Sequence, residues 1–206
     1  MTRLFSVLLA MVAIMVFAAN VLVFIPRSML TRLAPPPGLK PYSDLQLAGR
    51  AVYIANGCVY CHSQQVRDDR ITTDTSRFGR VSIPADYVYD FPHLLGTMRS
   101  GPDLINVGAR LPDRAWQLAH LYQPRALVPW SLMPSFPYLF EVRDRVYAGE
   151  ETVDLPAPYA PPAGRYIVAR PEASRLVDYL LSLDRSYPVR PEDLVPSDDM
   201  EEAPPP

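Results

Sequence analysis

The sequence predicts a mostly α-helical protein that is held in a membrane by one helix at its amino terminus. Three observations predict this fold class. The segment from Leu4 to Ile25 contains 22 residues without a charged side chain. Three later segments carry apolar residues at helical spacing. Most of the 24 prolines in the 206-residue chain lie outside those segments, which indicates few helices joined by long loops.

The apolar run is long enough to cross a bilayer. As a helix, 22 residues would span about 33 Å, against a hydrocarbon core of about 30 Å. A cleavable signal peptide is the alternative, and residues 17–19 offer a weak cleavage site. Its apolar region usually covers only about 7 to 15 residues, so we expect the run to be retained as an anchor. Basic residues flank it on both sides and leave its orientation open.

Composition divides the chain into four parts. We expect a membrane anchor over residues 1–33, with the span at about 4–25. A stiff proline-rich linker over 34–40 would follow, then a folded domain over 41–189. The tail over 190–206 has too few apolar groups to offset the entropy of ordering, and we expect it to be disordered.

Three amphipathic helices are predicted in the folded domain, over Ser43–Gly57 with Asp44 as its cap, Leu111–Pro124 and Arg170–Ser186. Residues 63–100 show no long period, and we interpret them as an ordered functional loop. So few helices give a thin apolar core for a domain of about 150 residues. We therefore expect a non-protein group to fill the centre of the folded domain.

The chain contains only two cysteines, Cys58 and Cys61, and His62 follows directly. C-x-x-C-H is the attachment motif of a c-type haem. Side chains three residues apart on a helical turn lie on the same face, so each thiol can form a thioether with one porphyrin edge. His62 can then ligate the iron. The motif predicts one covalently bound haem c.

Other interpretations of the motif are weaker. A thioredoxin-like thiol pair gives no role to His62 and lacks its βαβ context. A structural zinc site would need four ligands, with adjacent Cys61 and His62 sharing one tetrahedron with distant His93 or His120. The formal net charge of -2 and a pI near 5.9 indicate no nucleic-acid partner.

Four residues are candidates for the second axial ligand: Met98, Met133, His93 and His120. Low-spin electron-transfer haems often pair His with Met, which raises the reduction potential. We favour Met133, because prolines fix an extended backbone around it and aromatic residues follow it. We interpret His120 as a satisfied polar residue on its helix and His93 as a loop histidine.

Residues around the predicted haem have expected roles of their own. Pro102 has a free carbonyl that can accept the Nδ1–H of His62 and fix the tautomer of this ligand. Arg110 and Arg125 are candidate partners of the haem propionates. Both arginines can equally be simple surface residues.

Three strings, LAGRAVYIANGCVYCHSQQVR, YVYDFPHLLGTMRSGPDLINVGAR and HLYQPRALVPWSLMPSFPYL, resemble the mono-haem cytochrome c subunit, subunit II, of cbb3-type haem-copper oxidases. The resemblance covers the apolar run and about residues 41–140. It implies a class I-like cytochrome c domain with long loops behind the single transmembrane helix. It also implies haem on Cys58 and Cys61, iron ligation by His62 and Met133, and a proximal position for the segment that holds Pro102.

The resemblance implies partners and a location as well. The partners would be the catalytic subunit I, which reduces oxygen to water and pumps protons, a di-haem cytochrome c subunit or donor cytochrome, and membrane lipid. The haem domain would lie on the periplasmic side of the inner membrane. The chain would transfer electrons and have no active site of its own.

The sequence departs from the family pattern at two places. Gln65 and the acidic pair Asp68-Asp69 replace a largely apolar stretch after the haem motif, and Leu132 replaces a polar residue before Met133. Residues 143–170 have no clear counterpart, and we assign them to contacts with partner subunits. A nitric oxide reductase cytochrome c subunit and a free-standing anchored cytochrome shuttle are the alternative functions.

Overall fold

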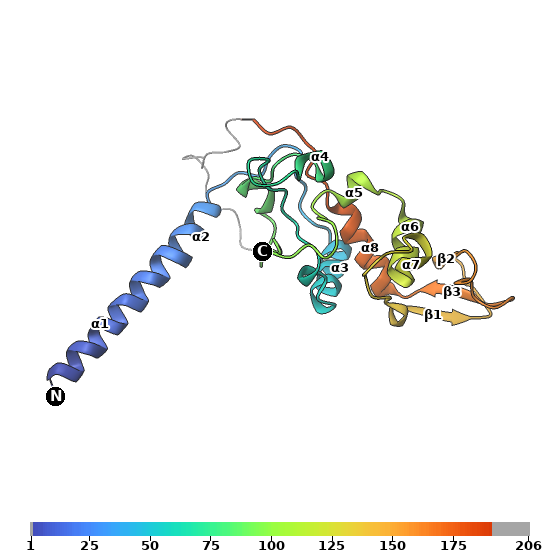
Figure 1. Cartoon of the computed structure of the whole chain (residues 1–206), viewed down its shortest axis with the longest axis horizontal. Coiled ribbons are helices and arrows are strands. Elements are labelled where there is room, and N and C mark those ends of the chain that lie inside the picture. Colours follow the sequence, from blue (N-terminus) through green and yellow to red (C-terminus); the bar gives the residue numbers. More distant parts are fainter. Residues whose placement is uncertain (1, 191–206) are drawn as a thin grey trace. The chain divides into compact units, whose positions relative to one another are not determined.

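The computed structural model of this chain describes residues 2–190 (Figure 1). The described residues form two compact units. The first combines 2–39 with 83–90 and 188–190, and the second combines 40–82 with 91–187. The tail predicted over 190–206 lies outside the described residues from position 191 onward.

One long apolar helix begins the first unit. It consists of α1 (Thr2–Ala19), the π-helical turn η1 (Asn20–Phe24) and α2 (Ile25–Leu30). Within Arg3–Leu30 an 18-residue window has a mean hydropathy of 2.8 and none of it is buried, so length and composition make this helix a candidate membrane span. It extends beyond the predicted 4–25. At 28 residues it is about 42 Å long, which a bilayer accommodates by helix tilt.

The π-helical turn ends two residues before Pro26, and the ring of this proline explains the widening. The Pro26 ring has no N–H and would collide with the carbonyl one turn earlier, so the helix widens there. The side-chain amide of Asn20 donates to the Val16 carbonyl at 2.8 Å. This bond satisfies the side-chain amide of an otherwise apolar helix.

Two crossing helices organise the second unit. These are α3 (Asp44–Ala55) and α8 (Pro171–Ser182), which pack closely together. Gly49 permits the crossing, because a Cβ at this position would lie 1.8 Å from the Arg175 carbonyl oxygen. The predicted cap was wrong by one residue. Ser43 caps α3 and forms a reciprocal capping box with Gln46.

The third predicted helix is α6 (Arg114–Tyr122), which also packs on α8. Asp113 caps it by accepting the N–H groups of Ala115 and Trp116 at 2.9 and 3.3 Å. Large, fully buried side chains of the three helices form part of this core: Tyr53, Leu118, Leu176, Val177 and Tyr179. All three helices predicted for the folded domain are present, each shorter than expected.

Short helical turns connect these helices. They are η2 (Cys58–Tyr60), α4 (Thr75–Phe78), η3 (Pro84–Tyr87), α5 (Val107–Arg110), α7 (Pro124–Leu127) and η4 (Pro137–Leu139). The loop between the first two predicted helices contains no long element, but backbone hydrogen bonds hold it. Gln64 N–H donates to the Leu95 carbonyl at 2.7 Å, and Ser82 N–H donates to the Val66 carbonyl at 3.0 Å.

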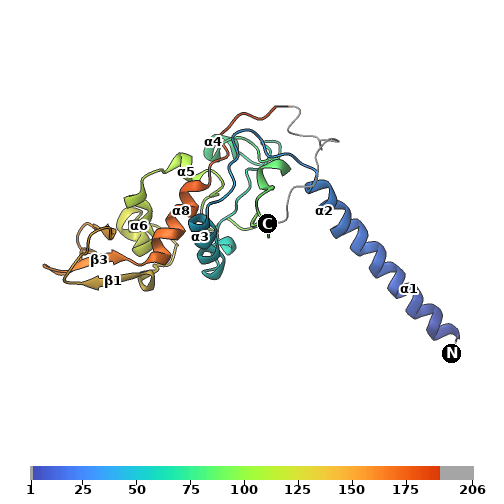
Figure 2. The same cartoon turned by 180° about the vertical axis from the view of Figure 1, so that it is seen from behind.

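A small antiparallel sheet was not predicted. Its strands are β1 (Phe140–Arg143), β2 (Thr152–Val153) and β3 (Tyr166–Ala169), in the order β1-β3-β2. Phe140 pairs with Ala169, and Thr152 pairs with Val168. Figures 1 and 2 show the sheet beside α6 and the start of α8. Part of the segment 143–170, for which the sequence predicted no secondary structure, thus contributes buried Ile167 and Val168 to the core.

Candidate haem site

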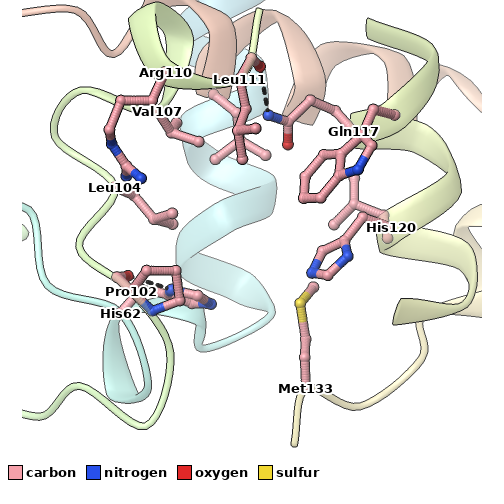
Figure 3. Close-up of a pocket in the computed structure, with 12 residues that line it drawn as sticks. His62, Pro102, Leu104, Val107, Arg110, Leu111, Gln117, His120 and Met133 are labelled. Atoms are coloured by element: carbon pink, nitrogen blue, oxygen red, sulfur yellow. Dashed lines mark hydrogen bonds between the residues drawn. The ribbon is translucent and has the colours of Figure 1, made fainter. Parts of the chain in front are cut away.

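A cleft opens in the second unit. Its wall is mainly apolar. Figure 3 shows His62 and Pro102 on one side of the cleft and His120 and Met133 on the other. The lining residues are His62, Pro102, Leu104, Val107, Arg110, Leu111, Trp116, Gln117, His120, Leu121, Met133 and Leu180.

A tight turn presents the two cysteines. Gly57, with φ at +67°, ends α3, and the chain then enters η2. The N–H groups of Cys61 and His62 donate to the Cys58 carbonyl at 3.2 and 3.0 Å, so one helical turn holds all three motif residues. Neither thiol is in a disulfide. Burial raises the pKa of Cys58 to about 11, which is opposite to the activation of a redox thiol.

The ring of His62 is oriented by the backbone beside it. Its Nδ1 lies 2.7 Å from the Pro102 carbonyl oxygen, which can only accept, so Nδ1 donates and Nε2 is left to bind a metal. Burial lowers the pKa of His62, which favours the neutral imidazole that ligates iron. Gly101 fits closely against the ring, since a Cβ there would lie 2.3 Å from Cε1 of His62.

The structure separates the four candidates for the second axial ligand. Met133 and His120 line the cleft that His62 also lines (Figure 3). Met98 is 62% exposed and His93 is exposed, and neither lines the cleft. Met133 follows Ser131 in an extended loop, and its N–H donates to the Ser131 hydroxyl at 3.2 Å. The thioether of Met133 and the imidazole of His120 therefore remain as candidates for the second axial ligand.

His120 is not the satisfied polar residue that we expected. Its Nδ1 is buried and has no hydrogen-bond partner among the described residues. The ring stacks on Trp116, with a centroid distance of 4.6 Å and an interplanar angle of 9°. Burial lowers the pKa of His120 to about 4, so this imidazole is neutral at physiological pH.

The two candidate arginines have different surroundings. Arg110 lines the cleft and donates to the Asp103 carbonyl, and its buried Nε has no hydrogen-bond partner in the part of the chain that the structure describes. It can therefore offer a donor to an anionic group in the cleft. Arg125 is exposed and does not line the cleft, so the structure does not bring it to the predicted site.

A buried ionic network supports the His62 side of the cleft, and the sequence did not predict it. Arg99 forms ion pairs with Asp74 at 2.5 Å and with Asp103 at 3.3 Å. Asp103 also accepts from the Ser63 hydroxyl at 2.5 Å and from the Gln65 N–H at 2.8 Å. The network thus fastens the segment after His62 to the segment that contains Pro102.

These residues fit a c-type haem. The two thiols lie on one turn, the adjacent imidazole has its Nε2 left for a metal, and a second donor lies across an apolar cleft. Unpartnered buried polar atoms of His120 and Arg110 belong to residues of that same cleft, as expected where a bound group supplies their partners.

The family comparison agrees with this geometry. A family model described as cytochrome c oxidase, mono-heme subunit/FixO, matches residues 1–157, about three quarters of the chain. A comparison with curated proteins found no match. The matched region includes the apolar helix, the haem motif and the Met133 loop, and it ends before β3 and α8. The chain belongs to the FixO family of mono-haem cytochrome c oxidase subunits, as the sequence resemblance to the cbb3-type oxidase subunit predicted.

Proposed function

We propose that this chain is the membrane-anchored electron-transfer subunit of a cbb3-type terminal oxidase. Its single haem c would pass electrons from donor cytochromes to catalytic subunit I, which reduces oxygen to water and pumps protons. One observation carries the proposal: His62 and Met133 face one apolar cleft directly behind a C-x-x-C turn. Membership in the FixO family supports the assignment to an oxidase.

In this proposal the haem motif and the cleft supply the residues that hold the haem. Cys58 and Cys61 hold the haem covalently, and His62 and Met133 ligate its iron. The haem supplies one-electron redox chemistry when bound. The Pro102 carbonyl keeps a proton on Nδ1 of His62, and Arg110 offers a donor to a propionate. The apolar walls exclude water, which raises the reduction potential together with the methionine ligand.

The described fold supports a class I-like cytochrome c domain over residues 41–189. A helix precedes the haem motif, a second helix precedes the methionine loop, and a final helix crosses the first. We propose that residues 1–33 anchor this domain through one membrane crossing and that 34–40 form its linker. We propose that the haem domain lies on the periplasmic side, where c-type cytochromes receive their haem, with the amino terminus in the cytoplasm.

The partners follow from the proposed role. They are catalytic subunit I, a di-haem cytochrome c subunit or other donor cytochrome, and membrane lipid. We propose that residues 143–170, which include most of the small sheet, contact partner subunits. Exposed Tyr147, Tyr159 and Tyr166 offer amphipathic contact area in this segment.

Isolation of the native complex in mild detergent tests the function. Copper and b-type haems that co-purify with the chain are expected for an oxidase. Non-haem iron without copper would indicate a nitric oxide reductase instead, and neither metal would indicate a free-standing cytochrome. Either of these results would contradict the proposal.

A further inference from the structure

Two potential iron ligands, rather than one, face His62 across the cleft. The thioether of Met133 and the imidazole of His120 both belong to the opposite wall, where Figure 3 shows the tip of Met133 beside the His120 ring. Only one of them can occupy the sixth coordination position at a time. The proposed function gives Met133 this position and leaves His120 without a task.

His120 is held rigidly. It lies on α6, which Asp113 caps and which packs on α8, and its neighbours Ala119 and Leu121 are buried. The stacked Trp116 ring covers one face of the imidazole. The position of this ring is therefore fixed by a helix of the core rather than by the cofactor.

Met133 is held more loosely. Its loop contains no helix or strand from Val128 to Phe136, and the preceding Leu132 is 81% exposed. Trp130, in the same loop, is 82% exposed. The sulfur thus depends on a surface loop to reach the iron, whereas the imidazole beside it does not.

The chemistry of His120 suits ligation. Its Nδ1 is buried, has no hydrogen-bond partner within residues 2–190 and belongs to a residue of the cleft wall. A buried polar nitrogen without a partner destabilises the fold unless something in the cleft satisfies it. Neutral imidazole is among the commonest ligands of haem iron.

We propose that His120 is a reserve ligand of the haem iron, which takes the sixth position whenever the Met133 thioether is not bound. This inference rests on the proposed function, because it requires the haem. The exchange would keep the iron six-coordinate and low-spin, and it would close the distal side to small ligands such as carbon monoxide. It would also lower the reduction potential, since imidazole replaces a thioether.

The test uses the full chain, produced in cells that attach haem c and purified in mild detergent. In Met133→Ala, we expect a ferric haem that is low-spin with the spectrum of two histidine ligands and that does not bind carbon monoxide when reduced. In Met133→Ala with His120→Phe, we expect a high-spin haem that binds carbon monoxide. Phenylalanine keeps the ring that stacks on Trp116.

The chain supplies a matched control. It has three histidines, and His93 is exposed outside the cleft. Met133→Ala with His93→Phe should therefore stay low-spin, and His120→Phe alone should keep the His/Met spectrum. Met133→Leu, which preserves side-chain volume, replaces Met133→Ala if the alanine variant loses its haem.

Two results would overturn the inference: a high-spin haem in the methionine variant with His120 intact, or a low-spin haem when both residues are replaced. The mass of each chain separates these failures from a failure of the proposed function. If the wild-type chain carried no haem mass, the proposed function and this inference would both be wrong.

Discussion

Replacing Gly101 with alanine should disturb the proximal ligand. A Cβ at this position would lie 2.3 Å from Cε1, 2.7 Å from Nδ1 and 2.9 Å from Nε2 of His62. To restore ordinary contact at 3.4 Å, the ring and the new methyl group must separate by about 1.1 Å. The ring cannot turn away freely, because the Pro102 carbonyl holds one nitrogen and the iron would hold the other.

The expected loss of stability follows from the hydrogen bond between His62 and Pro102, which the substitution would break. A shift of about 1 Å lengthens the 2.7 Å contact between Nδ1 and the Pro102 oxygen beyond hydrogen-bond range. The loss should cost about 0.5 to 1.5 kcal/mol of unfolding free energy, which is the usual net contribution of one hydrogen bond. The iron–histidine bond should weaken as well, and part of the ferric haem should become high-spin.

Denaturant unfolding of the haem-loaded chain measures the first effect, and electron paramagnetic resonance of the ferric protein measures the second. Ser100→Ala, at the exposed neighbouring position, is the control and should leave both unchanged. An alanine variant at Gly101 with wild-type stability and an entirely low-spin haem would refute the reasoning.

Three further predictions concern the support of the cleft. Asp103→Asn leaves the Arg99 cation less compensated and should lower the unfolding free energy by about 3 kcal/mol in urea titrations. Gly49→Ala places a methyl group 1.8 Å from the Arg175 carbonyl and should cost about 3 kcal/mol or more, measured by the same titration. Burial raises the pKa of Asp74, but hydrogen bonds from Arg99 and from backbone N–H outweigh it and lower that pKa below 3.8. Ionised Asp74 should therefore stabilise the fold fully above pH of about 4, and this stabilisation should be lost as pH falls through the lowered pKa. In Asp74→Asn, the unfolding free energy should depend less on pH in this acid range.

Controls for these variants lie on exposed surfaces. Asp68 pairs with exposed Arg70 at 2.7 Å, and Asp68→Asn should change stability little, because water screens that pair. Ala51→Ser, on the exposed side of α3, is the control for Gly49→Ala. A loss in the Asp103 variant no larger than that in the Asp68 variant would mean that the buried network does not support the fold.

The sequence predicted the features that depend on residues close together in the chain, namely the turn of the haem motif and the three core helices. The spacing of Cys58, Cys61 and His62 lies within one turn, so the sequence alone indicated their common face. The three core helices carry apolar faces several turns long, and each is present. The cap was placed one residue late, because both Ser43 and Asp44 are good capping residues and only the backbone geometry distinguishes them.

The missed features depend on contacts between distant segments. The strands contain only two to four residues within a proline-rich stretch, which is too short for an alternating pattern to be recognised. Arg99 and Asp74 are 25 residues apart, and no motif links them. The exposure of Arg125 and the lack of a hydrogen-bond partner for Nδ1 of His120 among the described residues likewise depend on how distant segments come together.

The central claim is that Cys58 and Cys61 carry a haem whose iron His62 and Met133 ligate. Intact-mass measurement with an optical spectrum of the full chain, produced in cells that attach haem c, tests it most directly. We expect the mass of the chain plus one haem, resistant to acid-acetone extraction, and the spectrum of a low-spin haem with histidine and methionine ligands. A folded chain with unmodified mass and no visible absorption would contradict the account.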